Sequence, residues 1–146
     1  MKSVTFNLSM FFAVLFFFTS TTFAETATQL PGNENKRFVS ENDFYEQLDK
    51  KVYKEYDRAT YSVRKKMSYK EVAAAELTFL KKTGEYFGQK PQPLANQIDP
   101  DRQVYFLASF YQNEKEEFHK FIVLDAETKV KLYGGDRYHH YVNPYK

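Results

Sequence analysis

Glu76 is the residue whose type and position most suggest acid–base chemistry. In the second helix predicted below, its angle falls within the apolar arc that contains Val72 and Phe79. Burial among apolar neighbours raises the pKa of a carboxyl group and suits it to general acid or base catalysis. A hydrolase or lyase would pair Glu76 with a histidine, and His119 and His139 are the candidates. The alternative is structural, because a slightly rotated helix brings this carboxylate to the rim, where a Tyr, Lys or Arg can pair with it.

The histidines are also the candidates for metal binding. His139 and His140 are adjacent, Asp136 is nearby, and His119 lies further back in the chain. Neighbouring side chains of an extended strand point to opposite faces, so the adjacent pair could chelate one ion only if a turn near Gly134 relaxed that geometry. Neither HExxH nor the Cys/His spacing of a zinc finger occurs, and the chain contains no cysteine. We therefore predict no metal ion and no cofactor.

A basic face is predicted on the first helix. Three of its cations, Lys50, Lys54 and Arg58, lie opposite the apolar arc of that helix. Such a face could meet an acidic protein, an anionic cell-wall polymer or lipid headgroups. Glu55 and Asp57 intersperse negative charges, so an ordinary solvated helix surface is the alternative.

Aromatic residues concentrate in the C-terminal segment, which includes Tyr138, Tyr141 and Tyr145. Rings with an apolar body and a polar tip in a terminal segment can bind a partner. The same segment could instead fold back onto the sheet as a last strand. Both alternatives are equally consistent with the residues.

Residues 1–24 are typical of a cleavable export signal. Lys2 precedes an apolar run over residues 10–18, and Thr22 and Ala24 supply small residues before a cleavage point at Glu25. The run is too short for a helix that crosses a bilayer, so we predict no stable membrane span. The mature protein would then be secreted or periplasmic. An exported domain without cysteine favours a bacterial source.

The charge of the chain narrows the choice of partners. The formal net charge is +2 and falls to +1 without the leader, which contains Lys2 and no carboxylate. Proteins that bind nucleic acid usually carry a strongly basic domain or stripe, so we predict no nucleic-acid partner. All 12 tyrosines follow the leader, which favours contact surfaces or core rims rich in amphipathic rings.

Two helices are predicted to precede the strands. Residues 25–37 are polar and predicted to be a flexible mature N-terminus. The first helix is expected over residues 41–59. The second begins at the Ser-x-x-Glu capping box of residues 68–71 and runs to Thr83. A connecting loop with prolines and glycines follows over residues 85–102.

Three strands are predicted in the last third of the chain, over residues 104–111, 118–124 and 130–133. The short polar connections between them favour antiparallel pairing in a meander, to which the tail could add a fourth strand. The expected fold is α+β, with two N-terminal helices packed on a C-terminal antiparallel β-meander of three or four strands. Residues 38–146 are expected to form a single globular domain.

The residues favour an exported binding or accessory protein, such as an inhibitor, an adaptor or an envelope factor. It would act through an aromatic or basic surface on an unidentified protein or envelope polymer, as a monomer or weak oligomer. The alternative is a small exported hydrolase or lyase that uses Glu76 with His119 or His139. The enzyme hypothesis requires these groups to converge in one concave pocket, whereas the binding hypothesis requires an exposed aromatic or basic patch.

Overall fold

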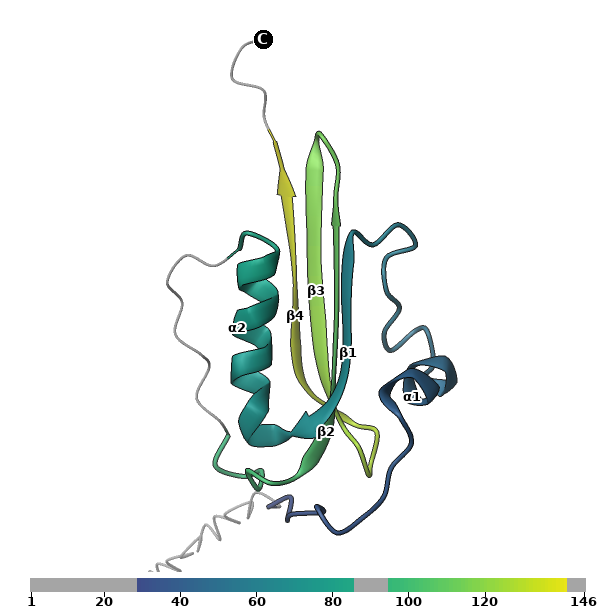
Figure 1. The fold of residues 1–146 in the computed structure, drawn as a ribbon, viewed down its shortest axis with the longest axis vertical. Coiled ribbons are helices and arrows are strands. Elements are labelled where there is room, and N and C mark those ends of the chain that lie inside the picture. The colour runs from purple at the N-terminus through teal and green to yellow at the C-terminus, as the bar shows by residue number, and fades with distance from the viewer. Residues whose placement is uncertain (1–28, 86–94, 142–146) are drawn as a thin grey trace, which may run out of the picture.

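The protein is described by a computed structural model that covers residues 29–85 and 95–141. It is an α+β fold with one four-stranded antiparallel sheet and two helices, which confirms the predicted class at this level (Figure 1). In chain order the elements are α1 (Glu41–Gln47), β1 (Tyr61–Ser68), the 3-10 turn η1 (Tyr69–Glu71), α2 (Val72–Lys82), β2 (Gln103–Gln112), β3 (Glu116–Asp125) and β4 (Lys131–His140). The strand order is β1-β2-β3-β4, and every neighbouring pair is antiparallel.

The prediction that both helices precede the sheet is wrong, because β1 lies between them. The first helix is also shorter than the expected range of 41–59. Side chains satisfy the backbone groups that a longer helix would need: the Asp49 carboxylate accepts the Lys51 N–H at 2.8 Å, and the Tyr45 hydroxyl accepts the Glu55 N–H at 3.1 Å. Such local bonds favour a turn over a continued helix.

The start of the second helix is confirmed in detail. The carboxylate of Glu71 accepts the backbone N–H of Ser68 at 2.9 Å and completes the predicted capping box. The first turn is the 3-10 segment η1, and regular α-helix continues to Lys82. Gly84 follows with a φ of 78°, a left-handed conformation that glycine adopts without a Cβ clash.

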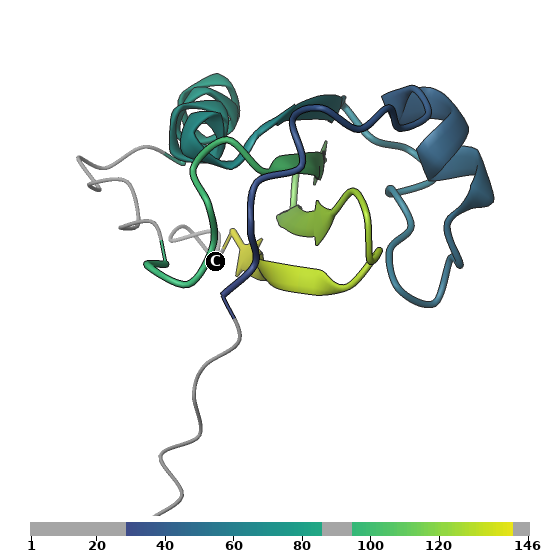
Figure 2. The ribbon, with the colours of Figure 1, turned by 90° about the horizontal axis from the view of Figure 1, so that it is seen from below.

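Each face of the sheet carries its own core, so the domain has three layers. Phe79 of α2, 1% exposed, packs against one face, and Phe44 of α1, 3% exposed, packs against the other. The Phe44 ring stacks on Tyr105 of β2 with centroids 3.7 Å apart. Figure 2 shows the two helices on opposite sides of the sheet. Burying one such phenylalanine contributes about 2 kcal/mol toward holding each helix on the sheet.

The segment before α1 is held against the sheet. Residues 29–37, part of the stretch predicted to be flexible, include Asn33, which is 3% exposed and accepts the backbone N–H of Gln103 at 2.6 Å. Beside it, Arg102 and Asp125 form a buried ion pair, with side chains 3% and 0% exposed. This polar network fixes the end of the sheet where β2 begins.

Some sequence predictions fall outside the described residues, namely the export signal of residues 1–24 and the binding residue Tyr145. Within the two described ranges, no helix is long and apolar enough to cross a bilayer.

Candidate functional site

Four aromatic side chains gather on the sheet face that carries α1. We call Tyr56, Tyr111, Phe118 and Tyr138 the aromatic surface. Phe118 is its centre, because its ring lies 4.7 Å from Tyr138, 5.8 Å from Tyr56 and 6.0 Å from Tyr111, measured between ring centroids. Three of the four form one rank across the sheet, since Tyr111 of β2 pairs with Phe118 of β3, which pairs with Tyr138 of β4. Directly opposed residues of neighbouring strands project to the same face, so the rank follows from the register.

The aromatic surface borders a cavity of about 230 Å³. Tyr56, Tyr111 and Phe118 line it, together with the exposed residues Asp57 and Arg58. Tyr138 is 54% exposed. Large apolar rings that remain open to solvent beside a cavity are typical of a contact site.

Polar groups frame the aromatic surface. The Lys120 ammonium lies 3.9 Å from the centroid of the Tyr56 ring, and the Tyr138 hydroxyl donates to Glu116 at 3.3 Å. Burial and the charge of Asp136 raise the pKa of Tyr56, so its hydroxyl is a neutral donor. The surface therefore combines apolar rings with hydrogen-bonding tips and charges of both signs.

The predicted basic residues do not lie on a helix. The Lys50 ammonium lies 3.7 Å from the centroid of the Tyr45 ring, and Lys54 forms an ion pair with Asp57 at 2.6 Å. Arg58 lines the cavity of the aromatic surface together with Asp57. These three residues lie on the irregular segment between α1 and β1, so the helical spacing that grouped them does not exist.

The predicted aromatic tail is divided between the two faces of the sheet. Strand β4 extends to His140, so the described part of the tail continues as a strand, and Tyr138 reaches Glu116 on the α1 side. The Tyr141 hydroxyl donates to Glu117, whose side chain lies on the α2 side. Of the tail tyrosines in the described residues, Tyr138 alone joins the aromatic surface.

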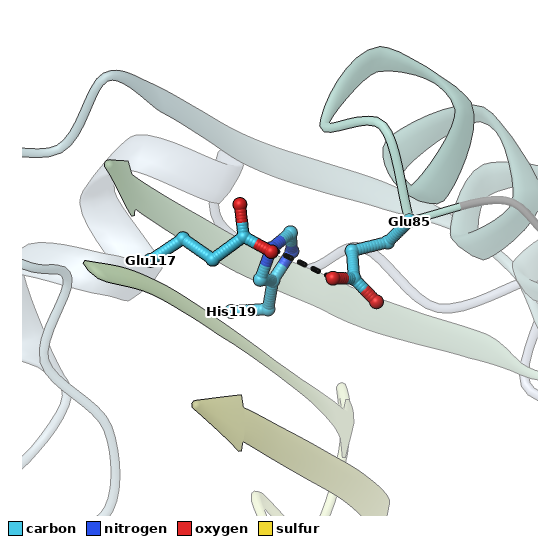
Figure 3. Close-up of side chains that lie close together, drawn as sticks. All are labelled: Glu85, Glu117 and His119. Atoms are coloured by element: carbon cyan, nitrogen blue, oxygen red, sulfur yellow. Dashed lines mark ion pairs between the residues drawn. The ribbon is translucent and has the colours of Figure 1, made fainter. Parts of the chain in front are cut away.

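A second group of side chains lies buried on the α2 side, and we call Glu85, Glu117 and His119 the acid–histidine cluster (Figure 3). The Nε2 atom of His119 is 3.6 Å from Oε1 of Glu85 and 3.7 Å from Oε1 of Glu117. The side chains are only 7%, 12% and 6% exposed for Glu85, Glu117 and His119. All three ligand atoms lie within 4.8 Å of one another.

Strand alternation and the end of α2 build this cluster. Glu117 and His119 are two residues apart on β3, so both project to the α2 face. The imidazole packs between rings, with centroids 4.5 Å from Phe110 and 6.3 Å from Phe79. The left-handed turn after α2 brings Glu85 to the same place.

Neighbouring groups hold the outer oxygen of each carboxylate. Arg137 forms an ion pair with Oε2 of Glu85, and the Tyr141 hydroxyl donates to Oε2 of Glu117. Burial lowers the pKa of His119, and the nearby carboxylates oppose that shift. Neither ring nitrogen of His119 has a hydrogen-bond partner.

Glu76 lies apart from the acid–histidine cluster. Burial raises its pKa, and its Oε2 atom is buried without a hydrogen-bond partner. Its charge acts on Tyr133, whose pKa is raised first by burial and then by Glu76. His139 is exposed and pairs with Glu117 across the strands. The structure thus groups His119 with two other glutamates, whereas neither Glu76 nor His139 belongs to that group.

Neither Glu85 nor Glu117 was predicted from the sequence as a site residue. Glu117 lies one residue before the predicted strand of residues 118–124, whereas the observed strand β3 begins at Glu116. Had the strand been extended by one residue, alternation would have placed Glu117 on the same face as His119. No signal in the sequence indicated Glu85, since it follows a helix end and its partners come from β3 and β4.

Comparisons of the chain with protein-family models, with curated proteins and with solved structures give no match. The case for a function therefore depends on the geometry of the two sites.

Proposed function

We propose that the protein acts by binding a partner protein through the aromatic surface. The observation that carries the proposal is the rank Tyr111–Phe118–Tyr138, which presents three rings side by side next to an open cavity. Tyrosine and arginine dominate the energetically important positions of protein interfaces, and both line this site. Such rings gain contact area with little loss of side-chain entropy.

The size of the cavity favours a side chain of a partner over a free small molecule. Pockets that bind small molecules usually enclose about 300–1,000 Å³. The cavity here is about 230 Å³ and is lined by two half-buried tyrosines, Tyr56 and Tyr111. One large apolar side chain of the partner would fill it, while Asp57 and Arg58 at its edge would pair with polar groups around that side chain. An envelope polymer is the other class of ligand to be tested.

Affinity capture tests this proposal directly. The purified protein with an affinity tag is exposed to envelope and culture fractions of the producing cells, beside a variant with Tyr111→Ser and Tyr138→Ser. Val130→Ser is the matched control, because Val130 is 60% exposed and directly precedes β4, at the end of the strand remote from Tyr138. A partner protein retained by the wild type and the control but lost from the double variant supports the proposal. Capture of a polymer instead, or equal capture by all three proteins, contradicts it.

We also propose that the protein is exported and acts in the periplasm or outside the cell, on the basis of residues 1–24. The N-terminal sequence of the released protein should begin at Glu25. Release with Met1 intact would contradict cleavage of the leader.

The hydrolase or lyase hypothesis receives less support. It requires Glu76 to meet His119 or His139, yet the group formed by His119 contains other carboxylates. The His119 side chain is also only 6% exposed, which leaves little room for a substrate beside its ring. This geometry suits an ion better than a substrate.

A further inference from the structure

We infer that the acid–histidine cluster is a binding site for a divalent transition-metal ion, with Glu85, Glu117 and His119 as its ligands. This inference is independent of the proposed binding function, because the cluster lies on the opposite face of the sheet from the aromatic surface.

The buried imidazole of His119 is unsatisfied. A buried polar side chain normally has a hydrogen-bond partner, yet neither nitrogen of His119 has one. The Nε2 atom points instead between two carboxylate oxygens at 3.6 and 3.7 Å, beyond the usual hydrogen-bond distance of about 3.2 Å. Two ligand atoms that each lie about 2.1 Å from one ion are about 3.6 Å apart when they subtend roughly 120° at the ion. The spacing therefore fits ligands that share an ion.

The two carboxylates of the cluster are oriented toward the imidazole. In both glutamates Oε1 faces the imidazole, while Oε2 is held from outside, by Arg137 for Glu85 and by Tyr141 for Glu117. Ligands of protein-bound metals are commonly fixed in this way by groups around them. Arg137 and Tyr141 are thus positioning residues that aim one oxygen of each carboxylate at a common point.

The charges of the cluster also favour a bound cation. Two carboxylates with ligand atoms within 4.8 Å of one another repel each other strongly in a buried environment, unless a proton or a cation lies between them. Arg137 compensates one of the two negative charges, and its own side chain is 56% exposed. A divalent ion supplies the remaining compensation at the point toward which the three ligand atoms converge.

The ligand set indicates the class of ion. One imidazole nitrogen and two carboxylate oxygens suit Zn²⁺, and three protein ligands leave a fourth position open. Mg²⁺ and Ca²⁺ prefer oxygen ligands alone and should bind much more weakly. Because Glu85 directly follows the helix-closing turn and the other ligands belong to β3, the ion would fasten the end of α2 to the sheet.

The test is calorimetric titration of Zn²⁺ into the purified, chelator-treated protein without a polyhistidine tag. We expect one saturable site per chain, and a thermal midpoint of unfolding that rises with zinc concentration. His119→Phe should weaken binding by more than roughly 100-fold while the variant still folds, because its ring would lie between Phe79 and Phe110. Tyr141→Phe removes only an outer hydrogen bond and should weaken binding by roughly 10- to 100-fold.

His140→Asn is the matched control, since His140 is exposed and pairs with Glu116 on the other face. Its zinc affinity should equal that of the wild type. The inference is overturned if the wild type shows no saturable zinc site, if His119→Phe binds as well as the wild type, or if Ca²⁺ competes equally with Zn²⁺. In the first case a proton shared by His119 and the carboxylates accounts for the geometry.

Discussion

Replacing Arg102 by methionine should lower the free energy of unfolding far more than replacing an exposed cation nearby. The guanidinium of Arg102 binds both carboxylate oxygens of Asp125, with Nη2 at 3.0 Å from Oδ1, and it also donates to the carbonyl of Pro31. One substitution therefore breaks a buried ion pair and releases the segment before α1. Lys70→Met is the control. Lys70 pairs with Asp101, the residue before Arg102, but the side chains of Lys70 and Asp101 are each 56% exposed.

The expected loss of stability depends on the hydrogen bonds that Asp125 keeps in the variant. Removing one partner of a buried ion pair costs about 3–5 kcal/mol, because the other charge stays buried without compensation. Asp125 keeps three donors: the Thr128 N–H at 2.7 Å, the Thr128 hydroxyl at 3.0 Å and the Glu127 N–H at 3.1 Å. We therefore expect a loss at the lower end, about 3 kcal/mol, or about 12 °C in the thermal midpoint at about 4 °C per kcal/mol. The exposed pair should contribute less than about 1 kcal/mol.

The same change should alter the pH dependence of stability. Burial alone would raise the pKa of Asp125, but hydrogen bonds from Arg102 and Thr128 outweigh it and hold the pKa below its usual value. A lowered pKa in the folded state gives stability that is present above the pKa of the unfolded carboxyl, about 3.9, and is lost as the pH falls through the folded-state pKa. The difference between wild type and Arg102→Met should therefore be largest near pH 7 and shrink below about pH 4.

Urea unfolding at several pH values measures this difference. The chain has 12 tyrosines and no tryptophan, so circular dichroism and tyrosine fluorescence are the suitable signals. A loss below about 1 kcal/mol for Arg102→Met would refute the reasoning, as would a loss equal to that of Lys70→Met. So would a difference that grows as the pH falls below about 4.

Further substitutions test other parts of the fold by the same unfolding measurement. Glu76→Gln should stabilise the protein at pH 7 by up to about 1 kcal/mol, because burial raises the pKa of Glu76 and its charged form disfavours folding. The gain should vanish near pH 3, where the carboxyl group is protonated, and a gain that persists there would contradict this. Tyr53→Phe should leave stability unchanged or raise it, since the Tyr53 hydroxyl is buried without a hydrogen-bond partner, and a loss above about 1 kcal/mol would show that the hydroxyl is satisfied. Gly134→Ala should cost about 2 kcal/mol, because a Cβ there would lie 2.6 Å from the carbonyl oxygen of Phe121. Gly135→Ala should cost less, since the atom nearest to a Cβ at Gly135 is a ring carbon of Phe121 at 3.3 Å, and equal costs would contradict the close approach at Gly134.

The parts of the fold that could be predicted from sequence are those fixed by local chemistry. The capping box at residues 68–71 and the left-handed Gly84 depend on groups a few positions apart, so α2 was correctly placed. Strands β2 and β3 were recognised because they are rich in aromatic and β-branched residues. Alternation also correctly placed His139 and His140 on opposite faces.

The first helix was overextended because side chains, near in the chain and from β2, accept the backbone N–H groups that a continued helix would use. The backbone N–H of Tyr56 donates to the hydroxyl of Ser109 at 3.0 Å, a contact with β2 that no helical spacing reveals. Strand β1 was missed although Tyr61, Val63 and Met67 alternate toward the α2 core, since Arg64 and its neighbouring lysines conceal the pattern.

Predicting the sites required the pairing register. Tyr138 was named from the sequence, but its partners Tyr111 and Phe118 adjoin it only once β2, β3 and β4 are aligned. The same holds for the acid–histidine cluster. Its ligands come from a helix end and a strand that are far apart in the chain. The spacing of residues in the sequence does not reveal that these two segments lie close together in space.

The most direct test of the proposed function compares two tyrosines near the end of β4 that lie on opposite faces of the sheet. The measurement is the amount of partner protein captured by Tyr138→Ala and by Tyr141→Ala, relative to the wild type. Tyr138 belongs to the aromatic surface, whereas the Tyr141 hydroxyl binds Glu117 on the other side. We predict that Tyr138→Ala loses the partner and that Tyr141→Ala retains it. Retention by Tyr138→Ala, or equal loss from both variants, would contradict recognition through the aromatic surface.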